Sequence, residues 1–119
     1  MTFILYPKRH LKKLIKEGEY VDALEFAKSI ESKFSKDPDY YFIIGSIYFI
    51  LEDFKTAISL FDKSVSLGGK DVEVLMLKTN AHLSLQEKEN ALTCVKQILE
   101  INPKNLEAIS LLDKLTDSS

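Results

Sequence analysis

Residues 40–51 read Tyr-Tyr-Phe-Ile-Ile-Gly-Ser-Ile-Tyr-Phe-Ile-Leu, a stretch that is apolar on almost every face a helix could present. A helix that is hydrophobic all round must be buried all round. Lipid is not its cover, because a helix of this length reaches only about 18 Å, short of the roughly 30 Å hydrocarbon core of a bilayer. Glu52 and Asp53 follow at once. We therefore expect protein, and no membrane, to surround this segment.

Length and composition indicate the size and class of the fold that buries this helix. The chain has 119 residues, 45% of them hydrophobic and 29% charged, with only 4 Gly and 3 Pro. This length suits one domain with a real core, so we expect a single domain over residues 1–119. The scarcity of turn residues disfavours an all-β fold and favours helices.

Charge and cysteine content limit the function classes. The net charge is only −2, yet residues 1–16 contain five basic residues and no acidic one. Such local basic charge argues against a nucleic-acid-binding protein. The single cysteine, Cys94, excludes an intramolecular disulfide. The apolar segment Met1–Tyr6 comes before the basic residues, whereas a signal peptide has its basic residues before its apolar segment. We therefore expect a cytoplasmic protein. Its ends are typical of a complete small protein, although an excised domain would look similar.

Outward from the apolar stretch, the sequence repeats. Three segments align at residues 18–24, 52–58 and 87–92, and their alanines Ala23, Ala57 and Ala91 are equally spaced along the chain. Apolar residues at helical spacing continue after each alanine, and another helical run precedes it, at roughly 7–17, 38–51 and 72–85. The pattern predicts three helix pairs and a seventh helix over about 104–116.

Local signals support these helix boundaries. Pro7 and Pro38 suit the first turn of a helix, where a missing N–H costs nothing, and Asp37 and Asp71 suit the capping position. Gly68-Gly69 and Asn102-Pro103 interrupt the chain between pairs.

With these segments the sequence resembles the tetratricopeptide repeat family, whose unit is a helix-turn-helix of about 34 residues, the interval that separates the three alanines. The resemblance implies an all-α, right-handed superhelical stack of three units, about 4–37, 38–71 and 72–105, plus a C-terminal capping helix over about 104–116. It also assigns repeat-packing roles, with small residues where helices cross and large ones at the turns. These residues are Ala23, Ala57, Ala91, Gly45 and Thr79 at the crossings and Tyr20 and Phe54 at the turns. Pro7, Leu11, Lys78 and His82 depart from the family pattern.

The resemblance also implies a binding surface, because such stacks line their concave side with the first helices. The expected groove has a basic wall at one end and an apolar centre. Its residues are Lys8, Arg9, Lys12 and Lys16 from the first unit, Phe42, Ile43, Ser46, Phe49 and Ile50 from the second, and Met76, Leu77, Asn80, Leu83 and Ser84 from the third. An apolar patch of this size is typical of a binding site. A second copy of the chain, or the apolar segment Phe3–Tyr6, would cover it equally well.

Some members of the family bind a C-terminal carboxylate through a clamp of lysines and asparagines. Lys8 matches one of these positions, but Lys12, Ile43, Glu73 and Leu77 replace the others. The sequence therefore predicts no clamp of this kind.

Catalysis finds little support in the sequence. The two histidines, His10 and His82, and Cys94 form no nucleophile–base pair or metal-ligand set, and there is no Gly-rich phosphate loop. Asp37-Pro38-Asp39 begins like a calcium loop but lacks its glycine and final glutamate. We expect neither an enzyme nor a bound cofactor or metal, a core position for Cys94, and for His82 a place between helices or facing solvent.

The sequence thus predicts a non-catalytic protein-interaction scaffold. Its partner would be an amphipathic helix or an apolar peptide with acidic flanks, oriented by Lys8 and Lys12. Two alternatives fit the same pattern: a small secretion-type chaperone for a hydrophobic client, and a self-assembling structural module whose groove is covered by another copy. A third interpretation of the lysines is that they form only a solvated helix face.

Overall fold

The computed structural model describes residues 5–117, and its regular structure in that range is helical. The helices are α1 Pro7–Lys16, α2 Tyr20–Ile30, α3 Pro38–Ile50, α4 Phe54–Ser66, α5 Val72–Ser84, α6 Lys88–Ile101 and α7 Leu106–Thr116, with a short 3₁₀ turn at Glu31–Lys33. The predicted first helices of each pair agree with α1, α3 and α5 to within one residue. The seventh helix begins two residues later than predicted, because Asn105 caps it.

Side-chain caps start the later helices at a constant interval. Asp37, Asp71 and Asn105 have the same spacing as the alanines, and the side-chain oxygen of each accepts a hydrogen bond of 2.9 Å from a backbone N–H in the first helical turn. Each cap satisfies a donor that the helix itself leaves unpaired. The period of the sequence is therefore also a period of backbone capping.

A second periodic feature is the turn inside each pair. Gly18, Glu52 and Gln86 again recur at the interval of the alanines and adopt positive φ values of 76°, 62° and 60°. In the middle turn, Asp53 N–H bonds to the Tyr48 carbonyl at 2.9 Å and Glu52 N–H to the Phe49 carbonyl at 3.0 Å. The other two turns repeat both bonds. This is the Schellman arrangement, which normally places glycine at the left-handed position.

Only the first of the three turns has glycine there, so the other two are strained. A left-handed conformation costs a residue with a Cβ roughly 1–2 kcal/mol, offset in part by the entropy that glycine loses on folding. We predict that Glu52→Gly raises the free energy of unfolding by about 0.5–1 kcal/mol, measured by urea denaturation.

The control for this substitution is Glu25→Gly, in the middle of α2 with ordinary helical geometry and an exposed side chain. It should lower the free energy of unfolding by about 1 kcal/mol. If both variants lose stability, relief of the left-handed strain at residue 52 does not determine the effect of Glu52→Gly on the free energy of unfolding.

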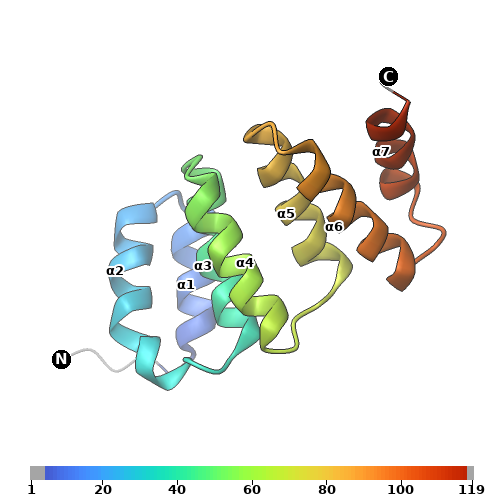
Figure 1. Ribbon diagram of the computed structural model, residues 1–119. Helices are drawn as coiled ribbons and strands as arrows, with labels where there is room; N and C mark the ends of the chain where they lie inside the picture. The colour runs from blue at the N-terminus through green and yellow to red at the C-terminus, as the bar shows by residue number, and fades with distance from the viewer. Residues whose placement is uncertain (1–4, 118–119) are drawn as a thin grey trace.

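The helices follow one another along an elongated body of 58 × 24 × 20 Å (Figure 1). Each helix packs against its neighbour in the chain, and α3 additionally packs against α1 and α5. Within the described range, α2, α4 and α6 make no such contacts with one another. Because the first helices touch and the second helices are spread apart, the stack curves with α1, α3 and α5 on its concave side.

Helix α3 is the centre of this arrangement, as its sequence predicts. It packs against α1, α2, α4 and α5, and Tyr40, Ile43, Ile44, Gly45 and Ile47 are buried. The Tyr40 hydroxyl, although buried, donates a 2.6 Å hydrogen bond to the Ala27 carbonyl, so its polar group is satisfied. Four neighbouring helices thus account for most of the apolar character of residues 40–51. The expected burial on every face is wrong at the C-terminal end, where Ile50 and Leu51 are 45% and 47% exposed.

Helices α3 and α4 approach each other closely where they cross at Gly45. A Cβ built on Gly45 would lie 2.7 Å from the ring of Phe61 and 3.3 Å from Leu60 Cβ. Phe61 is fully buried, and Ala57, one turn earlier on α4, is fully buried too. The absence of a side chain at residue 45 is therefore what lets α4 pack this close.

Two effects of opposite sign compete when Gly45 is replaced by Ala. Helix propensity favours alanine by about 0.8–1 kcal/mol, whereas overpacking against a confined ring costs about 1–3 kcal/mol. We predict a net loss of stability of up to about 2 kcal/mol for Gly45→Ala, seen as a lower urea midpoint with an unchanged slope.

Ser59→Ala provides the comparison, because Ser59 lies on the exposed side of α4. It should gain up to about 0.5 kcal/mol from propensity alone. A stabilised Gly45→Ala variant would contradict the proposed crossing.

The residues that depart from the family pattern have local explanations. Leu11, which corresponds by register to Gly45, is fully buried, and α1 packs less extensively on α2 than α3 does on α4. Lys78 Nζ reaches Asp62 Oδ1 of α4 at 2.6 Å. His82 is buried, and its Nδ1 lies 2.8 Å from Glu87 Oε1. The two polar departures are thus paired with acidic side chains.

Two further observations complete the fold. Cys94 is buried, as predicted for a core residue, and burial raises the pKa of its thiol. None of the helices in the described part of the chain has the length and apolar character required to span a membrane.

Candidate functional site

The concave side contains three neighbouring hollows. The first, of about 240 Å³, lies between α1 and α3 and is lined by Lys12, Ile15, Lys16, Phe42, Ile43 and Ser46. The second, of about 350 Å³, shares Lys12 and Phe42 with the first and extends to Glu73 and Val74 on α5. The third, of about 500 Å³, shares Glu73 with the second and is lined by Val72, Glu73, Met76, Leu77, Asn105 and Glu107.

Because each hollow shares residues with the next, together they form one continuous depression across α1, α3, α5 and α7, here called the concave groove. Its largest part has a structural cause. Among the described residues, α7 packs against α6 and makes no comparable contact with α5. The row of touching first helices is therefore interrupted after α5, and the space left between α5 and α7 is the third hollow.

The structure distributes the predicted groove residues unevenly. Seven of them line the concave groove: Lys12, Lys16, Phe42, Ile43, Ser46, Met76 and Leu77. Phe49, Ile50, Asn80 and Leu83 lie further along α3 and α5, outside these three hollows. The groove runs nearer the N-terminal ends of α3 and α5 than the sequence predicts. The segment Phe3–Tyr6, considered as a cover, lies partly outside the described residues; its described part, Leu5 and Tyr6, is exposed.

Several apolar groove residues also belong to the core. Ile43 is only 3% exposed, so it forms the floor of the groove and offers little free surface. The ring of Phe42 lies 6.1 Å from that of Phe61, and the ring of Phe49 lies 5.4 Å from that of Phe54. Phe42 therefore joins α3 to α4 and presents only part of its ring to the groove, and Phe49, outside the groove, joins the same two helices.

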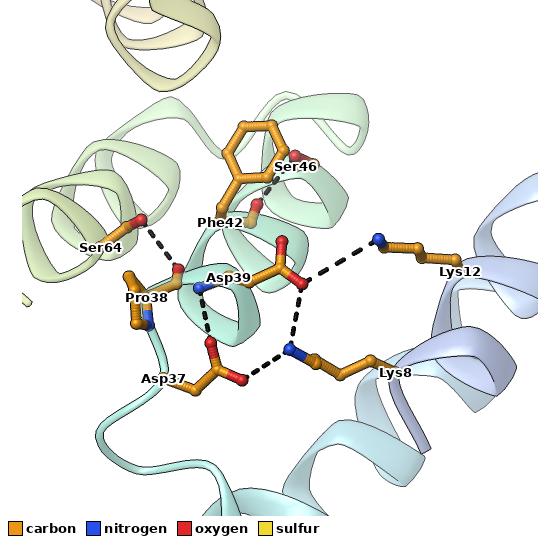
Figure 2. Close-up of polar contacts among 8 residues, drawn as sticks. All are labelled: Lys8, Lys12, Asp37, Pro38, Asp39, Phe42, Ser46 and Ser64. Atoms are coloured by element: carbon orange, nitrogen blue, oxygen red, sulfur yellow. Dashed lines mark hydrogen bonds and ion pairs between the residues drawn. The ribbon is translucent and has the colours of Figure 1, made fainter. Parts of the chain in front are cut away.

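Lys8, which was expected to orient acidic residues of a ligand, makes ion pairs within the chain. Figure 2 shows the Lys8 ammonium between two carboxylates at the start of α3, 2.7 Å from Asp37 Oδ2 and 3.3 Å from Asp39 Oδ2. Lys12 approaches Asp39 from the other side at 4.0 Å. Lys8 thus stabilises the contact between α1 and α3. The basic end of the groove consists of Lys12 and Lys16, both exposed, and Arg9 lies instead over the ring of Tyr6.

Electrostatics around this pair shift two pKa values. The hydrogen bond to Asp37 raises the pKa of Lys8 against the opposing effect of desolvation. Partial burial alone would raise the pKa of Asp37, but hydrogen bonds from Lys8 and the Asp39 N–H, together with the lysine charge, lower it overall. An acid with a lowered pKa in the folded state adds stability above its unfolded pKa, and this is lost as the pH falls through the folded value.

We predict that Lys8→Met lowers the free energy of unfolding at pH 7 by about 0.5–1 kcal/mol, the range for a half-exposed ion pair. The difference from the wild type should shrink as the pH falls below about 4, because Asp37 becomes neutral in both proteins. Urea denaturation at several pH values measures it. Lys16→Met serves as the control, because Lys16 makes no ion pair within the described residues. A difference between Lys8→Met and the wild type that stays constant at all pH values would contradict a stabilising ion pair between Lys8 and Asp37.

Acidic residues at the other end of the groove are the feature that the sequence analysis missed. Asp39, Glu73 and Glu107 follow the spacing of the helix caps, each in the first turn of its helix. Asp39 is paired with lysines, whereas Glu73 and Glu107 line the third hollow and have no ion pair within the described residues. The same spacing that located the alanines would have located this acidic column.

The described residues show no other arrangement with evident chemistry. No group of three or more His, Cys, Asp or Glu side chains suited to a metal ion occurs among them. A separate hollow of about 470 Å³ lies on the convex side between α2 and α4, lined mainly by Tyr40, Tyr41, Tyr48, Leu24 and Leu60. The concave groove is therefore the candidate functional site.

Comparison with protein families agrees with the fold. The model of the tetratricopeptide repeat matches residues 38–68 and 72–105, which together are more than half of the chain. The chain therefore belongs to the tetratricopeptide repeat family, as the sequence resemblance predicts. Comparison with curated proteins gave no significant match.

Solved structures show the same architecture. The first repeat domain of Spaghetti (RPAP3), bound to the HSP90 peptide SRMEEVD, is 26% identical with a TM-score of 0.84, over 96% of this chain and 90% of that one. The second such domain of human RPAP3, in complex with the HSP70 peptide SGPTIEEVD, is 18% identical with a TM-score of 0.81, over 94% and 93%. The Yersinia enterocolitica type III secretion chaperone SycD, in complex with a YopD peptide, is 14% identical with a TM-score of 0.82, over 92% and 89%. These similarities confirm the all-α helical-repeat fold.

Proposed function

We propose that the protein is a non-catalytic interaction scaffold that binds an apolar peptide segment with an acidic flank in the concave groove. The observation that carries this proposal is the continuity of the three hollows across four helices. Single exposed apolar residues are normal on a protein surface, but a depression that crosses several helices and combines apolar with polar lining is typical of a site for another chain. Phe42, Met76 and Leu77 supply apolar surface in the groove, and the second hollow also has Asp39, Asp71 and Glu73 in its lining.

The lining of the groove fits such a ligand. Phe42, Met76 and Leu77 are half-buried along its length, so each keeps apolar surface that a ligand would remove from water. That burial contributes about 25 cal/mol per Å². Ile43 and Val74 beneath them are packed in the core, which provides a rigid floor. A preformed floor reduces the ordering cost of binding.

The end of the groove that contains Lys12 and Lys16 would orient the bound peptide. Lys12 and Lys16 are one helical turn apart on α1 and both line the first hollow, and Lys16 has no ion pair in the described range. Two exposed cations beside an apolar hollow attract a carboxylate and accelerate its encounter with the groove. An acidic residue next to the apolar segment of the ligand therefore suits this end.

The structural relatives support a peptide ligand, because the Spaghetti (RPAP3) domain, 26% identical to this chain, is bound to a peptide. The ligand proposed here would be held differently from a terminal carboxylate in a clamp. Ile43, Glu73 and Leu77 replace the polar and basic groups of such a clamp, and Lys8 is occupied by Asp37 and Asp39. Apolar contacts and the Lys12–Lys16 pair would carry the affinity instead.

The test uses a fluorescent synthetic peptide with a leucine-rich centre and a run of glutamates at one end. Wild-type protein should bind it with an affinity that falls as salt is added. The variant Lys12→Glu with Lys16→Glu should bind about five- to tenfold more weakly, because two attractive exposed charges become repulsive. Fluorescence anisotropy measures both effects.

The matched control is Lys96→Glu with Lys104→Glu, two exposed lysines outside the groove with the same change in net charge. It should bind like the wild type. Light scattering across a wide concentration range, done first, establishes whether a second copy already covers the groove. A concentration-dependent mass together with no peptide binding would contradict the proposal and favour self-assembly.

A further inference from the structure

The end of the concave groove opposite the lysines selects a second feature of the ligand. We infer that the third hollow, between α5 and α7, receives an arginine or lysine side chain of the bound segment. The ligand then has an acidic residue at the first hollow, an apolar centre, and a basic anchor in the third hollow. This inference rests on the proposed function and assigns the chemistry of its ligand.

The shape and lining of the third hollow suit a long amphipathic side chain. Its volume is about 500 Å³, the largest of the three groove hollows. Val72, Met76 and Leu77 provide apolar surface, and Glu73 and Glu107 provide carboxylates from opposite sides, one on α5 and one on α7. Arginine and lysine bury their aliphatic stems against apolar surface while the charged group remains near water or a carboxylate.

The carboxylates are available for such an anchor. Of the three residues in the acidic column, Asp39 lies within ion-pair distance of Lys8 and Lys12. Glu73 and Glu107 have no ion pair in residues 5–117 and are exposed. Acidic residues in the first turn of a helix also complement the helix dipole. That effect stabilises each helix, whether or not a ligand is bound, so a binding measurement separates it from anchoring.

Charge at the two ends of the groove fixes the direction of the ligand. Lys12 and Lys16 line the first hollow and Glu73 and Glu107 line the third. A segment placed in the opposite sense would set its acidic end on the glutamates and its basic end on the lysines, and like charges in contact disfavour such a complex. An apolar peptide with two acidic flanks would be repelled at the α5–α7 end for the same reason.

The test uses two synthetic peptides that differ at one position. Both have glutamates at one end and a leucine-rich centre; the first ends in arginine and the second in glutamine. On wild-type protein the arginine peptide should bind about three- to tenfold more tightly, the range for exposed ion pairs with one cation. On Glu73→Gln with Glu107→Gln the two peptides should bind equally. Circular dichroism checks that the variant is folded.

The control variant is Glu89→Gln with Glu100→Gln, which makes the same charge change at exposed positions of α6 outside the groove. It should keep the preference for arginine. A spin label beside the arginine should broaden the amide signals of α5 and α7, and a label beside the glutamates should broaden those of α1.

The outcomes separate the inference from the proposed function. If both peptides bind the wild type equally, the anchor is wrong and the groove remains a peptide site. If the arginine preference persists in the double glutamine variant, or the labels broaden the opposite helices, the anchor lies elsewhere and the inference is overturned. If neither peptide binds, the proposed function is overturned and the anchor with it.

Discussion

The structure depends on how closely α4 approaches α3 at Gly45. Because residue 45 has no side chain, the ring of Phe61 lies against the α3 backbone. Two further contacts join the same helices. Ser64 of α4 donates a 2.8 Å hydrogen bond to the Pro38 carbonyl, and the ring of Phe61 packs against the ring of Phe42. One crossing thus builds the core and also sets the aromatic residue at the centre of the groove. The contacts that stabilise this unit are therefore also the contacts that position the proposed site.

Much of the fold was predictable because its period is expressed in the backbone itself. Caps at Asp37, Asp71 and Asn105 and left-handed turns at Gly18, Glu52 and Gln86 recur at one common interval, and each is a local requirement that sequence spacing reveals. The groove was less predictable. Lys8 is paired with Asp37, 29 residues away, and nothing in the helical periodicity of α1 indicates that partner. The third hollow arises because the backbone of α7 packs against α6 and stays apart from that of α5, which is a matter of tertiary packing.

Basic and acidic side chains lie at different ends of the concave side, a separation that the net charge does not reveal. A net charge of −2 describes a chain whose concave side is basic at α1 and acidic at α5 and α7. Between these ends, Asp39 pairs with Lys8 and approaches Lys12, so part of the basic charge is neutralised within the chain. Lys16 at the α1 end of the groove has no ion pair within the described residues, and acidic side chains line the second and third hollows.

The packing of α7 has a consequence for local unfolding. A terminal helix whose backbone packs against a single neighbour, α6, is expected to open with less free energy than a helix enclosed on several sides. The same helix forms one wall of the third hollow. If a ligand occupies the third hollow as proposed, it binds the closed form and not the frayed one, so by mass action it would protect α7 from opening. Slower amide hydrogen exchange in α7 would then accompany occupancy of the proposed site.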